Sequence, residues 1–484
     1  MSNEQGGGEN MEAGRLAQYG SRIDLPVAKD VQLAPASGLN PIIRDAIDTH
    51  KLITPEGIKA SSAMGPYARV FGRDTLVTTS LFLKTRQYGE DYVDNKTLVS
   101  AMRPLISNIA TEDNKELGIR SGAVPHEMGT LAEGFPKDWE KHVKDGTGVL
   151  YDTADATGRA MLVISELAKE NPDDLEVQKE LLPAMVPMTK WAIANSNDHD
   201  GLIGFTGAEY DDDRIKSGAK GLTNHTWQDC GFSIVDHEGQ IPKHPIKPVE
   251  EQALTWAALH ESADRLQESD PALSREAREA ADKLKKTFNE KFVYTDDKGV
   301  YLARAIDGDG NQIRTINIDA LIALGYVYDG KSILEDEDLT LPIIRRSMDE
   351  LYSPVGGLRT QSSNGLIHEG NTYHGDTAYW PHAQTMAAIA LEATAERVKN
   401  TDDAKECHYY ATEAAKGAAG LILYFKSPVE LAVISDTGDI DVFKEIKEDG
   451  TPQESTRWQA WAAGSAAWLE GFLQSRGEEI PVPV

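Results

Sequence analysis

The strongest constraint on the fold is a helical spacing of apolar residues that recurs along almost the whole chain. Apolar side chains that return every three or four residues mark a helix with one buried face. Eleven stretches show this spacing clearly, and residues 40–53 are a further candidate. We therefore predict an all-α protein. The eleven stretches are residues 75–89, 97–110, 157–170, 177–196, 250–266, 274–292, 318–327, 340–352, 383–400, 407–425 and 455–473.

The segments between these predicted helices are rich in Gly, Pro, Asp and aromatic residues, and several are too long for simple turns. Long loops on a compact scaffold usually carry function. No Ser/Gly-rich or Pro-rich linker divides the chain after residue 40. A dozen paired helices predict a toroid of α-hairpins closed on itself, with the loops at its mouth. We expect one domain over residues 31–484 and a flexible N-terminal tail over 1–30.

The charge of the chain narrows the choice of ligand. Acidic residues outnumber basic ones by 78 to 49, which gives a net charge of −29. Such a surface repels polyphosphates, so nucleic acids and anionic membranes are not expected as partners. A neutral ligand fits this charge better. The sequence does not indicate an oligomeric state.

The sequence shows no signal for export or membrane insertion. Its first residues, "MSNEQGGGENMEAGRLAQYG", have no apolar core, and no later apolar run is long enough to span a bilayer. The two cysteines, Cys230 and Cys407, are too few for a disulfide framework and fit a reducing compartment. We expect a cytoplasmic protein.

The loops repeat one theme, which is aromatic rings beside carboxylates and guanidinium groups. Sugar rings stack on aromatic faces, while their hydroxyls take charge-assisted hydrogen bonds from Asp, Glu and Arg. The loops therefore predict a sugar site. They include "YARVFGRDT" (67–75), "SGAVPHEMG" (121–129), "LYDTADAT" (150–157), "NHTWQDCG" (224–231), "RTQSSN" (359–364), "NTYHGDTAYWPHAQT" (371–385) and "FKEIKEDG" (443–450).

Other chemistries find little support. The chain has no G-x-G-x-x-G opening a helix, no P-loop, no G-x-S-x-G and no H-E-x-x-H. The stretch "DGDGN" (307–311) resembles the start of a calcium loop, but the twelfth position is Ile318 instead of Glu. We interpret it as a Gly-rich turn between short strands, and "DDD" (211–213) as a solvated loop where calcium stays an open alternative. No metal or organic cofactor is expected.

Eight loop motifs also occur in the order seen in one known family. They are "FGRDT", "VPHE", "YDTADAT", "TWQD" followed by "HEGQIPKHPIKPVEEQAL", "DGDGNQIRT", "GGLRTQSS", "YHGDTAYWPH" and "KEIKEDG". Each is weak alone, but together they make residues from about 50 to about 475 resemble the amylo-α-1,6-glucosidase family, the glucosidase module of glycogen debranching enzymes. The resemblance implies an (α/α)6-barrel catalytic domain like that of glucoamylase. It also implies an inverting, exo-acting hydrolase that releases glucose from α-glucosides.

The resemblance implies two catalytic carboxyl groups. Asp229, two residues after Trp227, matches the general acid, and an apolar ring beside an acid helps it to keep its proton. Glu445 is the best match to the general base. The same loop also contains Glu448 and Asp449, so the choice among its acids is open.

The resemblance further implies that Arg73 and Asp74 hold hydroxyls of the terminal glucose. The loop at 373–382 is one residue longer than the commonest form, and no stretch resembles a glucanotransferase domain. The substrate is therefore left open between α-1,6 branches of glycogen and short malto- or isomalto-oligosaccharides. The predicted substrate-binding residues are Tyr67, Arg73, Asp74, His126, Glu127, Tyr151, Asp155, Trp227, Glu250, Arg359, His374 and Trp380.

Structural roles compete with several of these predictions. Arg73 and Asp74 could cap a helix; Asp155 could cap another, a role that is compatible with sugar binding. His126 with Glu127 could be a structural loop pair, Glu250 could serve the dipole of its helix, and Trp380 could be a core residue. Three other functions stay open: a glycoside phosphorylase, a sugar epimerase, and a sugar-binding protein without activity.

Overall fold

The computed structural model describes residues 31–54, 56–62, 67–133, 135–363, 373–435, 437–446 and 452–484. The predicted tail, residues 1–30, lies outside the described residues. So do Glu448 and Asp449 and the side chain of Glu445.

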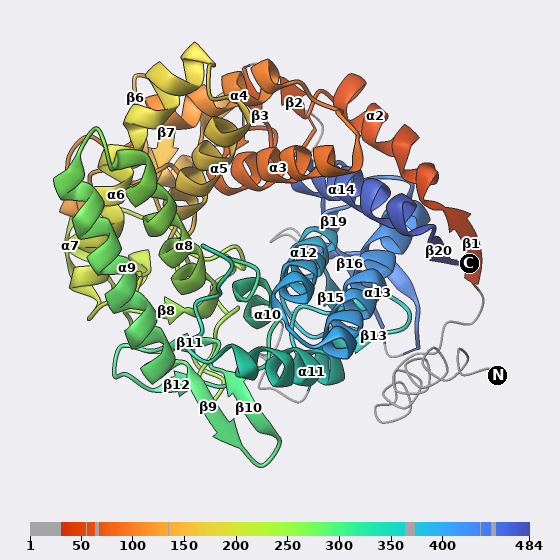
Figure 1. Ribbon diagram of the computed structural model, residues 1–484. Helices are drawn as coiled ribbons and strands as arrows, with labels where there is room; N and C mark the ends of the chain where they lie inside the picture. The colour runs from red at the N-terminus through yellow and green to blue at the C-terminus, as the bar shows by residue number, and fades with distance from the viewer. Residues whose placement is uncertain are drawn as a thin grey trace.

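Among the described residues, six inner helices form a closed ring (Figure 1). Each packs against the next in chain order, and the last returns to the first. The predicted α-hairpin toroid is therefore confirmed. The inner helices are α3 (Gly72–Thr85), α5 (Ala156–Glu170), α8 (Val249–Leu266), α10 (Asp319–Ala323), α12 (Pro381–Arg397) and α14 (Ala460–Arg476).

In the part of the chain that the structure describes, six outer helices surround this ring, each packed on an inner partner. All twelve predicted helical stretches correspond to these twelve helices. One more described helix, α7 (Asp212–Ser217), was not predicted; Asp211 caps it by accepting from the N–H groups of Asp213 and Arg214. The outer helices are α2 (Asn40–Asp48), α4 (Asn95–Ser107), α6 (Leu182–Asp198), α9 (Pro271–Lys291), α11 (Thr340–Leu351) and α13 (Thr401–Phe425).

The two rings differ in composition because they bury different amounts of surface. On the outer helix α9 the buried positions recur every three or four residues, from Leu273 to Phe288, and the opposite face is exposed to solvent. On the inner helix α14 every residue from Ala460 to Leu473 is buried. Small residues allow this. A Cβ added at Gly464 would come within 3.2 Å of the Leu81 side chain on α3.

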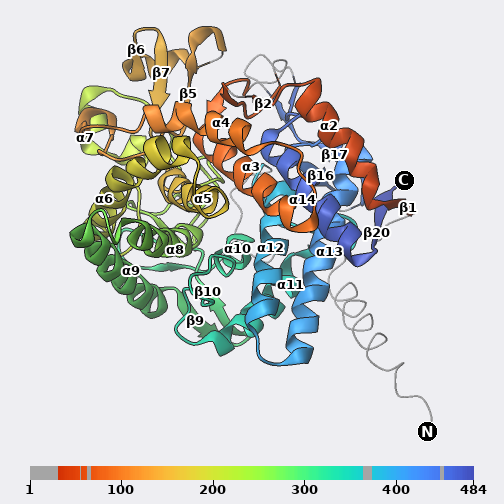
Figure 2. The same ribbon diagram turned by 45° about the horizontal axis from the view of Figure 1, so that its top comes forward.

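The sixth hairpin is built from both ends of the described chain. Helix α2 packs on α14, and β1 (Val31–Pro35) pairs antiparallel with β20 (Glu479–Pro483). Figure 2 shows these four elements together at one side of the barrel. The ring is therefore closed by elements that are more than 400 residues apart in sequence.

Short strands precede the inner helices at one end of the barrel. Strand pairing fixes the position of the chain just before a helix begins: β4 lies before α3, β8 before α8 and β15 before α12. One sheet has the strand order β4 (Val70–Phe71), β5 (Glu127–Thr130), β7 (Thr147–Leu150) and β6 (Val143–Lys144). A second sheet has the order β12 (Gln312–Ile313), β11 (Ala305–Ile306) and β8 (Lys247–Pro248). A third has the order β15 (Ala378–Tyr379), β16 (Ala432–Ile434) and β17 (Ile440–Val442). The hairpins are β2 (Ile53–Thr54) with β3 (Gly57–Ile58), β9 (Val293–Asp296) with β10 (Gly299–Leu302), β13 (Tyr352–Ser353) with β14 (Gly357–Leu358), and β18 (Lys444–Ile446) with β19 (Pro452–Glu454).

The stretch "DGDGN" is a turn between β11 and β12, as predicted. Asp307 accepts hydrogen bonds from the backbone N–H groups of Asp309 and Asn311, which closes the turn on itself. Among the described residues, none of the helices has the length and apolar content needed to cross a bilayer.

Candidate active site

The first turns of the inner helices bring polar and aromatic side chains together at one end of the barrel. The free backbone N–H groups and the dipole of a helix start favour negative charge nearby, so carboxylates are well placed there. The residues at or next to these starts are Arg73 and Asp74 (α3), Asp155 (α5), Glu250 and Glu251 (α8), Asp319 (α10), Trp380 and His382 (α12), and Gln459 and Trp461 (α14).

A pocket lies at this end. Six of its described lining residues were predicted from the sequence: Tyr67, Arg73, Asp74, Trp227, Asp229 and Trp380. The other six are Ala60, Phe71, Tyr373, Glu430, Gln459 and Trp461. Half of these described lining residues are therefore aromatic, and the rest include three carboxyl groups. Such a lining suits the ring faces and hydroxyls of a sugar.

Glycine at position 72 lets α3 begin close to a neighbouring loop. A Cβ at Gly72 would lie 2.1 Å from the carbonyl oxygen of Pro125, and the Gly72 N–H donates to the His126 carbonyl at 2.7 Å. Helix α3 starts here, with Phe71 as its N-cap and no side-chain cap. The interpretation of Arg73 and Asp74 as a helix cap is therefore wrong, and both side chains line the pocket.

Arg73 is held firmly in place. Its Nε donates to Asp155 Oδ2 at 2.8 Å, and its Nη2 donates to the Thr226 carbonyl at 2.8 Å. Asp155 is fully buried and also accepts from Arg159 Nε at 2.9 Å. Burial alone would raise the pKa of Asp155, but the charges of Arg73 and Arg159 outweigh it and lower that pKa. Asp155 is thus a permanent anion that orients two arginines.

Asp155 occupies the N-cap position of α5, as predicted, but its side chain makes no capping hydrogen bond. Its Oδ1 accepts instead from the Thr153 hydroxyl at 2.6 Å. The physical reason is that two buried guanidinium groups compete for this carboxylate more strongly than a backbone N–H does.

Asp229 differs from Asp155 in how it is held. Its side chain is 33% exposed, and its contact with Arg73 Nη1, at 3.5 Å, is at the long limit of a hydrogen bond. Burial raises the pKa of Asp229, with the Arg73 charge opposing and the Asp155 charge adding to the effect. A carboxyl group in this setting keeps its proton more readily than one in water.

Glu430 is a pocket residue that the sequence reasoning missed. It lies just before β16 and is 3% exposed. The Tyr373 hydroxyl donates to its Oε1 at 2.6 Å, and the Thr456 N–H donates to its Oε2 at 3.1 Å. Burial raises the pKa of Glu430 to about 7, while these two hydrogen bonds oppose the rise and the charge of Asp229 adds to it.

Glu445, predicted as the general base, has its backbone on β18, opposite Gln453 of β19. Its side chain, like Glu448 and Asp449, lies outside the described residues, so this assignment stays a prediction. Glu430 is a second candidate that the structure places in the pocket itself.

Asp74 is the third carboxyl group of the pocket. Its Oδ1 accepts from Gln459 Nε2 at 3.0 Å. Burial raises the pKa of Asp74 to about 8; the Arg73 charge opposes this, and Glu430 and Asp229 add to it. Asp74 can therefore donate as well as accept a hydrogen bond near neutral pH.

Several predicted residues lie behind the pocket and not among its described lining residues. Glu127 is paired with Arg69 at 2.6 Å. His126 is 2% exposed, and burial lowers its pKa to about 3, which keeps it neutral. Glu250 accepts from Arg159 and from the Tyr326 hydroxyl. These groups are packed against their own partners.

Three more predicted residues are also set apart. His374 is fully buried and stacks on Trp380 with ring centroids 5.0 Å apart, so it supports a pocket wall from behind. The Tyr151 hydroxyl donates to the Asn108 carbonyl at 2.7 Å, and its ring lines a different cavity. Arg359 is 7% exposed and is not among the described lining residues of the pocket.

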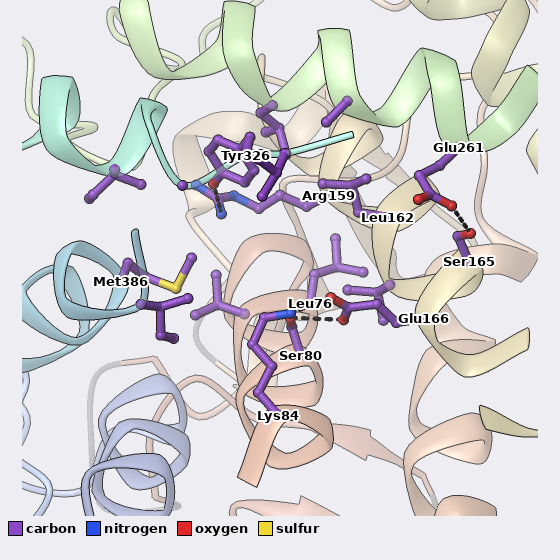
Figure 3. A pocket seen from close by; sticks show the side chains of 18 of the residues that line it. Leu76, Ser80, Lys84, Arg159, Leu162, Ser165, Glu166, Glu261, Tyr326 and Met386 are labelled. Atoms are coloured by element: carbon purple, nitrogen blue, oxygen red, sulfur yellow. Dashed lines mark hydrogen bonds and ion pairs between the residues drawn. The ribbon is translucent and has the colours of Figure 1, made fainter. Parts of the chain in front are cut away.

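A larger cavity lies along the middle and C-terminal parts of the inner helices (Figure 3). Its space open to water-sized molecules is about 240 Å³, against about 70 Å³ for the pocket. Figure 3 shows Arg159 beside Tyr326, and Lys84 bonded to Glu166 away from them. Arg159 also bonds to Asp155 and Glu250, so it belongs to the layer that separates the cavity from the pocket.

Solved structures of glycoside hydrolases share this fold at low sequence identity. A GH63 mannosylglycerate hydrolase from Thermus thermophilus, in complex with glucose, has a TM-score of 0.56 and 12% identity, over 88% of this chain and 99% of that chain. A metal-independent alpha mannosidase from Streptococcus pneumoniae, in complex with alpha-1,6-mannobiose, has a TM-score of 0.53 and 13% identity, over 96% of each chain. A bacterial glucoamylase complexed with acarbose has a TM-score of 0.50 and 14% identity, over 91% of this chain and 56% of that chain. These likenesses show an (α/α)6 barrel.

A search of curated protein sequences gives no match. The family model of amylo-alpha-1,6-glucosidase matches residues 140–385, which is half of the chain. The matched part contains Asp155, Asp229 and Trp380, whereas Arg73 and Glu430 lie outside it. Because the match covers this much of the sequence, the protein belongs to the amylo-alpha-1,6-glucosidase family of glycoside hydrolases.

Proposed function

We propose that this protein is an inverting, exo-acting glycosidase that releases glucose from an α-glucoside. The observation that carries the proposal is the pair of carboxyl groups Asp229 and Glu430 in one aromatic pocket, each with a raised pKa. Two such carboxyl groups are what an inverting glycosidase uses, one as acid and one as base.

Asp229 is the better candidate for the acid. A third of its side chain is exposed in the pocket, so its proton can reach the oxygen of a leaving group. Its long contact with Arg73 leaves the carboxyl group able to stay protonated. The family resemblance assigns it the same role.

Glu430 is the better placed candidate for the base. Hydrogen bonds from the Tyr373 hydroxyl and the Thr456 N–H stabilise its ionised form and fix both of its oxygens. A fixed carboxylate can orient and deprotonate a water molecule on the other face of the sugar. Glu445 stays the alternative that the resemblance favours.

The pocket wall supports a sugar as the ligand. Trp380 and Trp461 pack edge to face at 5.9 Å, and His382 stacks on Trp461 at 3.8 Å, so these rings are rigid. Rigid aromatic surface can bind the apolar face of a pyranose at little entropic cost. Arg73 and Asp74 can hydrogen-bond its hydroxyls. We propose α-1,6-linked glucosides or short malto- and isomalto-oligosaccharides as substrates.

The rival functions find less support in the pocket. Phosphorolysis needs a cationic site for phosphate, and Arg73 is the sole cation among the described lining residues. An epimerase would need histidines facing the sugar, but His374 and His382 are buried behind tryptophans. A binding protein without activity has no need for two carboxyl groups with raised pKa.

The test has two parts. A panel of α- and β-glycosides identifies the substrate, and proton NMR of the first-formed sugar reads its anomer; release of the β-anomer from an α-glucoside shows inversion. The Asp229→Asn variant is then compared on a substrate with a poor leaving group and on α-glucosyl fluoride. We expect the first activity to fall by about 10²–10⁴-fold and the second by much less, because fluoride needs little protonation. Equal losses would remove Asp229 from the role of acid.

A further inference from the structure

The loop that carries Asp229 is anchored at the two residues before it. The Trp227 indole N–H donates to Asp319 Oδ1 at 2.7 Å. The Gln228 side-chain amide donates to both oxygens of Asp319, at 2.9 Å each. A single carboxylate at the start of α10 thus holds consecutive residues of this loop.

Gln228 has its side-chain amide fully engaged. Besides Asp319, its Nε2 donates to Asn317 Oδ1 at 2.9 Å. Its Oε1 accepts from Arg304 Nη2 at 2.6 Å, and Arg304 Nη1 donates to Gln361 Oε1 at 2.8 Å. Gln228, Arg304 and Asp319 are each at most 5% exposed. A buried network of hydrogen bonds of this kind defines one backbone position sharply.

Asp229 itself is held much more weakly. Its side chain meets Arg73 at the long distance of 3.5 Å and is a third exposed. The position of its carboxyl group is therefore set mainly by the anchored residues before it. Proton transfer is sensitive to such placement, because a shift of about 1 Å can cost about a hundredfold in rate.

We propose that Asp319 is a positioning residue for the reaction: by holding Trp227 and Gln228 it aims the Asp229 carboxyl group at the glycosidic oxygen. This inference rests on the proposed function, in which Asp229 is the acid. Asp319 is buried below the loop, is not among the described lining residues of the pocket, and acts on the substrate only through Asp229.

The test is the Asp319→Asn variant of the full chain. An asparagine has an NH2 donor in place of one carboxylate oxygen. With that donor at the Oδ2 position it would face the Gln228 Nε2 donor instead of accepting from it, so the anchor of Gln228 is weakened. We expect turnover of a glycoside with a poor leaving group to fall by about ten- to a hundredfold, and hydrolysis of the glycosyl fluoride to change little. KM should stay nearly constant, because the sugar-binding residues are untouched.

Glu406→Gln is the matched control. Glu406, on the outer helix α13, is 9% exposed and accepts from Arg345 Nε at 2.9 Å, from Arg345 Nη2 at 2.6 Å and from the Tyr410 hydroxyl at 2.8 Å. The Glu406→Gln variant loses a buried, hydrogen-bonded carboxylate, as Asp319→Asn does, but at a position far from the pocket. A general loss of stability lowers both reactions equally in either variant.

The outcomes separate the two proposals. If Asp229→Asn shows the leaving-group contrast and Asp319→Asn lowers both reactions equally, the positioning role is overturned and the acid stands. If Asp229→Asn itself shows no contrast, the proposed function fails. Should Asp319→Asn not fold, Trp227→Phe removes one of the same hydrogen bonds; a contrast in that variant supports the inference, and wild-type behaviour on both substrates overturns it.

Discussion

The two cavities of the barrel show how one ring of helices can carry very different chemistry at its two ends. The pocket lies at the N-terminal ends of the inner helices, and its described lining residues include three carboxyl groups, two of them deeply buried. The larger cavity has apolar walls, and its charged groups are paired: Lys84 with Glu166, and Lys169 Nζ with Glu261 Oε1 at 2.6 Å.

The helix dipoles account for part of this difference. Helix starts stabilise carboxylates, whereas helix ends stabilise cations, and Lys84 and Lys169 lie in the last turns of α3 and α5. The larger cavity of this barrel is thus not the one that contains the proposed catalytic carboxyl groups. The pocket is distinguished by carboxyl groups whose pKa is raised by burial. The charged groups of the other cavity are held in ion pairs.

The largest expected effect is at Glu430. If it is the base, Glu430→Gln should lower kcat by about 10²–10⁴-fold and leave substrate binding nearly intact. Steady-state kinetics of the variant beside Glu445→Gln measures this. Azide should restore part of the turnover of the inactive variant and give a β-glycosyl azide from an α-glucoside. If Glu430→Gln is fully active and Glu445→Gln is inactive, the general base is Glu445 on β18 and not Glu430.

The next effect is at Arg73. Lysine keeps the charge but cannot reach Asp155, Thr226 and Asp229 together, as the guanidinium does. We expect Arg73→Lys to lower kcat/KM by about a hundredfold, since each hydrogen bond to a charged group is worth about 1.5–3 kcal/mol. Circular dichroism and thermal melting check that the variant is folded. Wild-type kcat/KM in a folded variant would remove Arg73 from the site.

A smaller effect is expected from pH. The base must be ionised, and burial raises the pKa of Glu430 to about 7, so kcat/KM should fall about tenfold per pH unit below that value. Tyr373→Phe removes a donor that stabilises the ionised form. In this variant the acid limb of the pH profile should move to higher pH. A shift to lower pH would mean that Glu430 is not the group that titrates.

The smallest effect is expected in the larger cavity. Lys84 and Glu166 are both about 30% exposed, and a pair of this kind contributes about 0–1 kcal/mol to stability. Lys84→Met should therefore leave kcat/KM unchanged and alter the free energy of unfolding by less than about 1 kcal/mol, as denaturant titration measures. A large loss of activity would show that this cavity takes part in catalysis, and the contrast between the two ends would collapse.

The fold could be predicted because nearly every helix of the barrel repeats its apolar residues over several turns. The failures are short elements. Helix α7, Asp212–Ser217, is too brief to show a period, and α10 ends at Ala323 although the pattern continues to Val327. A spacing that is measured over three or four residues cannot define a helix of five or six.

The site could be predicted only in part, for a different reason. Asp229 stands in a polar loop beside an indole, which is visible in the sequence. Glu430 sits between Val429 and Leu431, and its donor Tyr373 is 57 residues away, so nothing local distinguishes it from a structural acid. Asp155 is likewise understood only through Arg73, 82 residues earlier. Roles that depend on distant partners need the three-dimensional structure.

The hairpin that joins the two ends of the described chain also has a consequence for synthesis on the ribosome. Helix α2 is made more than 400 residues before α14, the helix on which it packs. Until α14 is made, Ile42 and Ile43, which are buried in the finished barrel, lack that surface. The nascent chain therefore exposes the apolar face of α2 while the residues between the two helices are made, and transiently exposed apolar surface of this kind is what chaperones protect.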